Sequence, residues 1–122
     1  MKIETTKWNG KHIMEINEKD RGQITIDGVY CDNAMQPKRY CESVRNHIKN
    51  GTFTNFLHEQ MHDFLKGAIN TINWNEKYIA RDGGVANSVG TFYNSLSCIK
   101  HCDKICEAHT RFINDEYKII EN

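Results

Sequence analysis

The stretch His58-Glu59-Gln60-Met61-His62 contains residue types that bind zinc and activate water, at helical spacing. Residues four apart on a helix lie one turn above each other, so both imidazoles can reach one tetrahedral ion. The glutamate between them can then act as general base on a metal-bound water. The chemistry predicted is hydrolysis, with zinc on His58 and His62 and with Glu59 as the catalytic residue.

This five-residue string resembles the zinc-binding motif of the zincin metallopeptidases. The resemblance implies the same roles for the two histidines and the glutamate, and it covers five of the 122 residues. The chain departs from the family where charged Asp63 follows the second histidine. Leu65 and Ala68 stand where the metzincin extension has its glycine and third histidine. The alternative, which the sequence favours, is a pair of solvated histidines beside an apolar helix face.

A second cluster of zinc-binding residue types lies near the C-terminus. Thiolates and imidazoles are the ligands that zinc prefers. One straight helix cannot close a tetrahedron with ligands spread over three turns, so further ligands would come from the histidines of the first string. The alternative is that the cysteines are buried and pack as small apolar side chains. We expect no cofactor other than the zinc that these clusters allow. The cluster consists of Cys98, His101, Cys102, Cys106 and His109.

The run RDGGVAN at residues 81–87 has the features of an anion site at a helix start. Glycines let the backbone approach a ligand closely, and the free N–H groups of a first helical turn attract anions. Arginine adds a bidentate donor for phosphate or carboxylate. Alternatively, Asp82 is only an N-cap and the glycines only form the turn. The predicted ligand-binding residues are Arg81, Gly83, Gly84 and Asn87, with Arg111 from a neighbouring subunit.

Composition limits the classes of function. A chain of 122 residues fits one domain, here residues 1–122, and its 16 basic residues balance its 16 acidic ones. The chain therefore has no broad positive electrostatic field that would attract nucleic acid. The sequence shows neither a membrane-spanning run nor the apolar core of a signal peptide, and its five cysteines are an odd number. These features predict a cytoplasmic protein with reduced thiols and no membrane partner.

Residues 2–30 predict a three-stranded antiparallel meander. Asn9-Gly10 is a strong hairpin signal, because both central positions of a type I′ turn need positive φ. A two-residue loop there places Ile3 opposite Ile16 and leaves Trp8 on the face away from the core. A third strand is expected near residues 23–27. The core face then consists of Ile3, Thr5, Met14, Ile16, Ile24 and Ile26.

The remaining chain predicts three helices that cover this face, the last one long, and hence an α+β fold. Apolar residues recur at helical spacing, for example in Phe53, Leu57, Met61 and Phe64. Two short extended pieces predict a fourth strand and a C-terminal strand. The expected helices span 37–50, about 52–73 and 82–113, and the expected strands span 77–80 and 117–121.

The long third helix predicts self-association. Such a helix is about 40 Å long at 1.5 Å per residue, whereas a domain of this size has a radius of gyration of about 14 Å. The helix would therefore extend beyond the domain, and burying its protruding part favours a homodimer or higher homo-oligomer. A large exposed aromatic side chain indicates a second interface. The predicted interface residues are Trp8, Val85, Val89, Phe92 and Leu96.

We therefore expect a small cytoplasmic binding or inhibitory protein that captures a host protein or a small anionic, nucleotide-like ligand by stoichiometric association. Abundant Asn, Ile and Lys with a single Pro indicate an AT-rich genome, such as that of a low-GC bacterium, its phages or mobile elements. Counter-defence inhibitors are examples of such proteins. The alternative is a miniature zinc hydrolase that uses the first histidine string.

Overall fold

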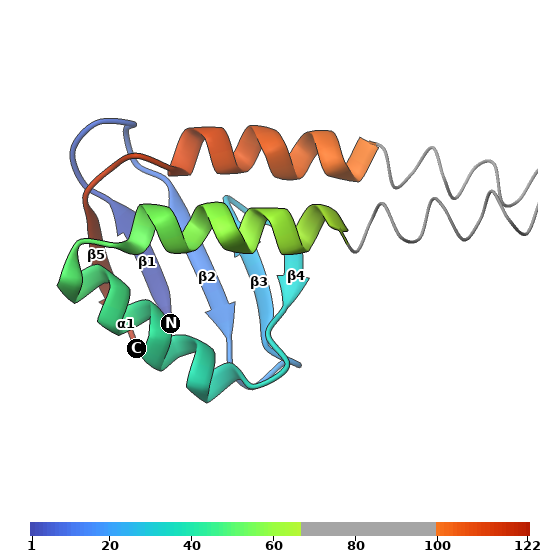
Figure 1. Ribbon diagram of the computed structural model, residues 1–122, viewed down its shortest axis with the longest axis horizontal. Coiled ribbons are helices and arrows are strands. Elements are labelled where there is room, and N and C mark those ends of the chain that lie inside the picture. The colour runs from blue at the N-terminus through green and yellow to red at the C-terminus, as the bar shows by residue number, and fades with distance from the viewer. Residues whose placement is uncertain (67–99) are drawn as a thin grey trace, which may run out of the picture.

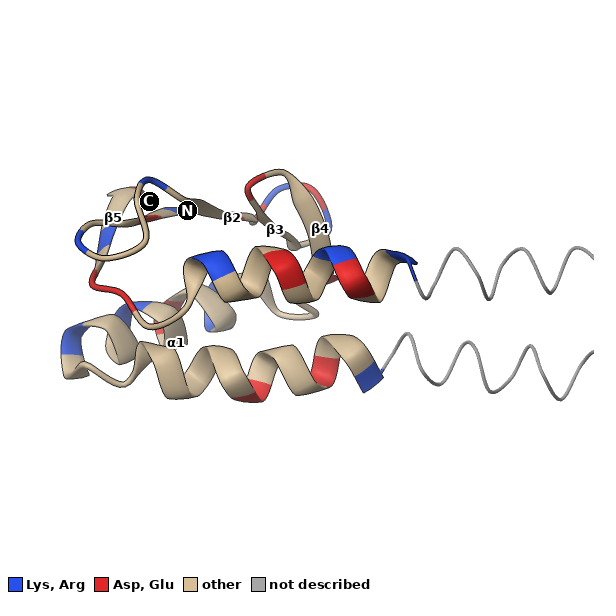
Figure 2. Ribbon diagram, turned by 90° about the horizontal axis from the view of Figure 1, so that it is seen from above, with Lys and Arg blue, Asp and Glu red and all other residues tan. Residues whose placement is uncertain are grey.

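The structure, a computed structural model, describes residues 1–66 and 100–122. These residues form a five-stranded antiparallel sheet with three helices on one of its faces, as Figures 1 and 2 show. The predicted α+β class is confirmed. The elements are β1 (Lys2–Thr5), β2 (Ile13–Asn17), β3 (Gln23–Ile26), β4 (Val29–Asn33), α1 (Pro37–Asn50), helix 53–66, helix 100–112 and β5 (Tyr117–Glu121).

The strand order in the sheet is β4-β3-β2-β1-β5, and every neighbouring pair is antiparallel. The predicted C-terminal strand is confirmed as β5, and it pairs with the N-terminal strand β1. Tyr117 and Ile119 pack against the core, and Lys118 between them is exposed. This alternation is the pattern of a strand with one buried face.

The three strands of the predicted meander are present as β1, β2 and β3, but a fourth strand, β4, also precedes the first helix, so the predicted number of N-terminal strands is wrong. The additional strand β4 follows a two-residue turn at Asp27-Gly28, which places Ile26 opposite Val29. Asp27 has φ 49° and Gly28 has φ 79°, as a type I′ turn requires. Asp-Gly is a hairpin signal of the same kind as Asn-Gly, so the sequence contained the information needed to find β4.

The register between β1 and β2 differs from the prediction by two residues. Ile3 lies opposite Met14 rather than Ile16. The expected two-residue type I′ turn at Asn9-Gly10 is absent. Gly10 has a positive φ of 78°, but the φ of Asn9 is not positive. Thr5 pairs with His12 instead, and the residues between them form a longer loop. A shift of two residues leaves each side chain within β1 and β2 on its predicted face, because the strand period is two.

The core lies between the sheet and the helices, and it contains the six side chains of the predicted sheet face. The apolar stripe predicted for the second helix is confirmed within the described residues, where Phe53, Leu57 and Phe64 are buried and Met61 is partly buried and packs against them. Edge-to-face contacts join Phe53 to Phe112 and Tyr117, with ring centres 6.5 and 4.7 Å apart. The helices contribute Cys41, Val44, Phe53, Leu57, Phe64, Ile105, Ala108 and Phe112.

The helix ends follow local sequence signals. α1 begins at Pro37, whose fixed φ suits the first helical position. It ends at Asn50 and is capped by Gly51, which has a left-handed φ of 73° and donates its N–H to the last turn. Helices 53–66 and 100–112 then run antiparallel, side by side across the sheet (Figure 1). No helix within 1–66 or 100–122 is long and apolar enough to cross a membrane.

Several predictions concern residues outside the described ranges. The strand at 77–80 and the first part of the long helix are among them. So are the interface residues Val85, Val89, Phe92 and Leu96. The self-association that these residues were expected to mediate stays a prediction.

Candidate functional site

The two histidine clusters meet where helices 53–66 and 100–112 pack together. The rings of His58 and His109 have centres 5.6 Å apart and are inclined by 59°. Glu59 and His62, the other members of the zincin-like string, are exposed on helix 53–66. Among the described residues, no group of three or more His, Cys, Asp or Glu side chains is placed to hold a metal ion. The structure thus pairs one histidine from each cluster.

His109 is the buried member of this pair, with 9 % of its surface exposed. Burial lowers the pKa of its imidazole below the usual value, and the neighbouring His58 lowers the pKa further. A hydrogen bond with the backbone of Leu57 acts in the opposite direction. Nε2 of His109 has no hydrogen-bond partner within the described part of the chain. Burial and the neighbouring imidazole thus both favour the neutral form of the His109 ring.

The other residues of the C-terminal cluster lie in different surroundings from His109. The ring of His101 stacks on Tyr30 of β4, with centres 5.7 Å apart. Cys106 is exposed and Cys102 is half-buried, while Cys98 lies outside the described residues. The expectation that these cysteines are buried is therefore wrong for Cys106.

The two fully buried thiols of the described chain belong to other elements, β4 and α1. Burial raises the pKa values of Cys31 and Cys41 to about 11. Such thiols stay protonated at neutral pH and are poor nucleophiles. They pack as apolar side chains, in line with the general tendency of free cysteine.

Of the residues in the predicted anion site, only Arg111 lies within the described part of the chain. The other predicted members, Arg81, Gly83, Gly84 and Asn87, lie outside the described residues. Arg111 is exposed, and its Nε is 4.0 Å from Oδ2 of Asp27 in the same chain. The guanidinium of Arg111 is therefore already beside a carboxylate.

Asp27 organises a polar cluster that the sequence did not predict. Its Oδ1 accepts a hydrogen bond from the N–H of Ile13 at 2.9 Å, and its Oδ2 lies 2.6 Å from Nδ1 of His12. These contacts connect the β3–β4 turn to the start of β2. Because the side chains of this cluster are partly exposed, the ion pair between Arg111 and Asp27 should stabilise the fold by no more than about 1 kcal/mol.

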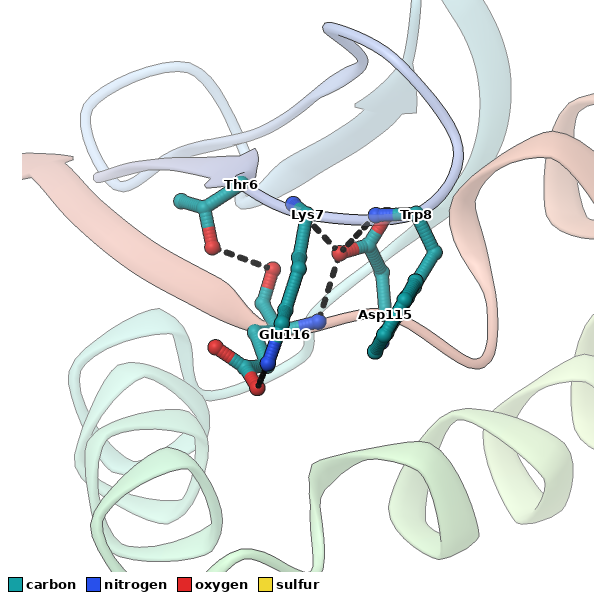
Figure 3. A network of polar contacts seen from close by, with 5 residues as sticks. All are labelled: Thr6, Lys7, Trp8, Asp115 and Glu116. Carbon is teal, nitrogen blue, oxygen red and sulfur yellow. Dashed lines mark hydrogen bonds and ion pairs between the residues drawn. The ribbon is translucent and has the colours of Figure 1, made fainter.

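Asp115 holds the β1–β2 loop in place, as Figure 3 shows. Its carboxylate accepts backbone N–H groups from Lys7 at 2.9 Å, Trp8 at 3.0 and 3.1 Å, and Asn9 at 2.7 Å. The side-chain amide of Asn9 also donates to the carbonyl of Ile113. Consecutive N–H groups that converge on one carboxylate fix the backbone of a loop.

The same loop displays Trp8, which is 66 % exposed. Trp8 lies in the loop and not on the outer face of the sheet, so its predicted position is wrong, although the ring is exposed as expected. Nζ of Lys7 lies 4.8 Å from the centre of the Trp8 ring and 2.9 Å from Oε1 of Glu116. The tryptophan is therefore an exposed aromatic side chain on a fixed backbone, with charged neighbours.

The Asp115→Asn variant should be less stable than the wild type at pH 7, by about 1–2 kcal/mol because the site is partly solvated. Although partial burial acts to raise the pKa of Asp115, hydrogen bonds from the Asn9, Trp8, Lys7 and Glu116 backbones lower it below its usual value. The carboxylate therefore stabilises the fold above its unfolded pKa, and this contribution is lost as the pH falls through the folded pKa. Urea unfolding of both proteins at pH 7 and near pH 3 measures the difference.

Thr6→Val is a matched control for this variant. It removes the hydrogen bond from Oγ1 of Thr6 to the carbonyl of Glu116, in the same contact between the loop and the chain before β5. It removes no carboxylate. Its cost should not depend on pH. A stability difference between wild type and Asp115→Asn that stays constant from pH 7 to pH 3 contradicts the stated role of the charge.

No protein-family model matches the chain, and no curated protein or solved structure matches it. A function for this protein therefore has to be argued from its own contacts. The described residues offer two sites with unusual chemistry. One is the clamped loop with Trp8, and the other is the histidine pair between the helices.

Proposed function

We propose that this chain is a small binding protein that captures a protein partner through the loop at residues 6–11. The observation that carries the proposal is the 66 % exposure of Trp8 on a backbone whose N–H groups are held by Asp115. Tryptophan is among the side chains that most often dominate the binding free energy of protein interfaces. A loop that is already ordered loses little conformational entropy on binding.

The surroundings of Trp8 suit a protein surface. Lys7 and Glu116 form an ion pair next to the ring, so the aromatic side chain has a charged rim. Interfaces commonly combine an aromatic anchor with a polar periphery. A hollow of about 370 Å³ on the same loop offers room for a partner side chain. It is lined by Glu4, Thr5, Thr6, Lys7, Gly10 and Lys11.

A protein partner is favoured over a small anionic ligand. Arg111, the described member of the predicted anion site, lies beside Asp27, whose negative charge opposes an incoming anion. The Trp8 loop presents an apolar ring instead. Stoichiometric occupation of a partner's surface is sufficient for inhibition, so the proposed role as a host-directed inhibitor needs no catalytic residue.

The Trp8→Ala variant should bind the partner at least about 30-fold more weakly than the wild type, because loss of a central aromatic anchor costs about 2 kcal/mol or more. Affinity capture on immobilised protein, mass-spectrometric identification and calorimetric titration with the purified partner measure the change. Native mass spectrometry of the complex gives its stoichiometry. A second copy of the chain as the captured species would identify Trp8 as a self-association residue instead.

Met35→Ala is the matched control. Met35 is 98 % exposed and immediately precedes the Gln36 N-cap of α1, so its truncation removes a similar apolar side chain from a different surface. Binding should be unchanged in this variant. Equal affinities for wild type and Trp8→Ala, with both proteins folded, would sink the proposal.

A further inference from the structure

A buried histidine, His109, lies at the contact between helices 53–66 and 100–112. The residue is 9 % exposed, and Nε2 of its imidazole has no hydrogen-bond partner within the described residues. The ring of His58 approaches it from helix 53–66, with ring centres 5.6 Å apart. A charged group in the interior needs both hydrogen bonds and a group of opposite charge. The described surroundings of His109 therefore suit a neutral imidazole better than a charged one.

The charges around His109 do not offset its burial. Burial lowers the pKa of the imidazole most, the positive charge of His58 lowers it further, and the hydrogen bond with the Leu57 backbone acts in the opposite direction. No other described charged side chain, on the sheet, on α1 or on either helix, contributes to this shift. The charged and titratable residues nearby in sequence on the two helices are exposed. They are Glu59, His62, Asp63, Glu107 and Arg111.

Protonation of His109 makes the contact between the helices unfavourable. A protonated imidazole donates from both nitrogens, so a second N–H would lack an acceptor among the described residues. Because the pKa of His109 in the folded chain lies below the usual value of about 6.5, the unfolded chain takes up this proton first. The stability of the folded state is therefore undiminished above about pH 6.5 and falls as the pH decreases towards the folded pKa and past it.

Two hydrogen bonds in series connect His109 to the Trp8 loop. The carbonyl of His109 accepts the N–H of Ile113 at 2.9 Å, and the carbonyl of Ile113 accepts the side-chain amide of Asn9. Asp115, two residues further along, binds the N–H groups of the loop. Its own pKa lies below the usual value, so its carboxylate stays ionised in mild acid. A displacement of His109 thus reaches the loop without titration of Asp115.

We propose that protonation of His109 separates helix 100–112 from helix 53–66 and loosens the Trp8 loop, so that mild acid weakens partner binding. Histidine is the side chain whose charge ordinarily changes near neutral pH. In protein switches of this kind, a local protonation acts on a packed contact that has two arrangements. The effect on affinity rests on the proposed binding function, whereas the separation of the helices does not.

An NMR titration of the imidazole groups in the full chain, with EDTA present, tests the first step. We expect His109 to titrate below the usual pKa of about 6.5. The Tm of the wild type should fall between about pH 7.5 and pH 5, and His109→Gln should show an at least about twofold smaller fall, because glutamine stays uncharged. His58→Gln should raise the pKa of His109, since it removes a like charge. His58 is exposed, so this variant is informative even if His109→Gln fails to fold.

Hydrogen exchange of the Lys7, Trp8 and Asn9 amides tests the connection to the loop. Their protection factors, corrected for the intrinsic rate at each pH, should fall at least about threefold between about pH 7.5 and pH 5 in the wild type. They should stay constant in His109→Gln. The matched control is His101→Gln, which removes an imidazole that stacks on Tyr30 from the same helix and should behave as the wild type.

Three results would overturn the proposal. They are a pKa of His109 at or above its usual value, equal pH dependences of Tm for wild type and His109→Gln, and unchanged protection of the loop amides in acid. None of these measurements includes a partner. A failure of the switch is therefore distinguishable from a failure of the proposed binding function, which the affinity of Trp8→Ala tests.

Discussion

Phe112→Ala should lower the free energy of unfolding by about 3–5 kcal/mol, the usual cost of deleting a large aromatic side chain from a core. The Phe112 side chain is fully buried. Its ring packs against Tyr117 with centres 5.3 Å apart, and its carbonyl accepts the Tyr117 hydroxyl at 3.0 Å. Because small domains are stable by only about 5–15 kcal/mol, this variant should be close to unfolding. Guanidinium denaturation followed by circular dichroism measures the change.

Phe112→Leu is the matched variant for this position. Leucine keeps most of the apolar volume, so we expect a cost of about 1–2 kcal/mol. The hydrogen bond from Tyr117 goes to the backbone and survives in both variants. Equal losses for alanine and leucine would show that the ring of Phe112 does not stabilise the contact between helix 100–112, helix 53–66 and β5.

Gly22→Ala should lower the free energy of unfolding by about 2–4 kcal/mol, because the new Cβ strains the backbone and collides with neighbouring atoms. Gly22 has φ +67°, which disfavours any residue with a Cβ. A Cβ there would also collide with the carbonyl oxygen of Ala34 and lie 2.8 Å from Cγ of Pro37. The N–H of Ala34 donates to the Gly22 carbonyl at 2.7 Å, so the two backbones cannot separate without losing this bond.

Gly28→Ala separates the strain from the collision. Gly28 has φ +79°, and a Cβ at this position has no atom within 4 Å. Only the backbone penalty should remain, about 1 kcal/mol. Thermal and urea unfolding of the two variants side by side give the comparison. If Gly22→Ala is no less stable than Gly28→Ala, the approach of the β2–β3 turn to the start of α1 is looser than the structure indicates.

Residue periodicity determined the core faces of β1, β2, β3 and helix 53–66. Alternation in the strands places Ile3, Met14, Ile24 and their neighbours on one face whatever the pairing, because the side-chain period of a strand is two. Spacing of three and four residues does the same for the helices, whose side chains repeat every 3.6 residues. Pro37 and Gly51 fix the ends of α1 through their own backbone preferences. All these signals act over short distances along the chain.

The candidate sites depended on contacts between distant residues. The sequence singled out Trp8, His58 and His109, favoured solvated histidines for the first string, and offered a metal site only with further ligands from the helix that carries His109. The structure instead places His58 beside His109 because two helices pack antiparallel. The spacing of four within one helix is visible in the sequence. The distance between two helices depends on how both pack on the sheet.

The β1–β2 loop likewise combines a local sequence signal with a contact to a distant residue. Asn9-Gly10 has the local preference for a two-residue turn, yet the observed loop is longer because Asp115 binds the N–H groups of residues 7–9. Asp115 lies more than 100 residues away in the sequence, so no local signal could reveal this contact. The sequence alone thus determined the faces and ends of elements, through steric preferences and periodicity. Only the tertiary structure decided the strand register, the position of β5 and the histidine pair, because hydrogen bonds and packing between remote segments outweigh a local turn preference.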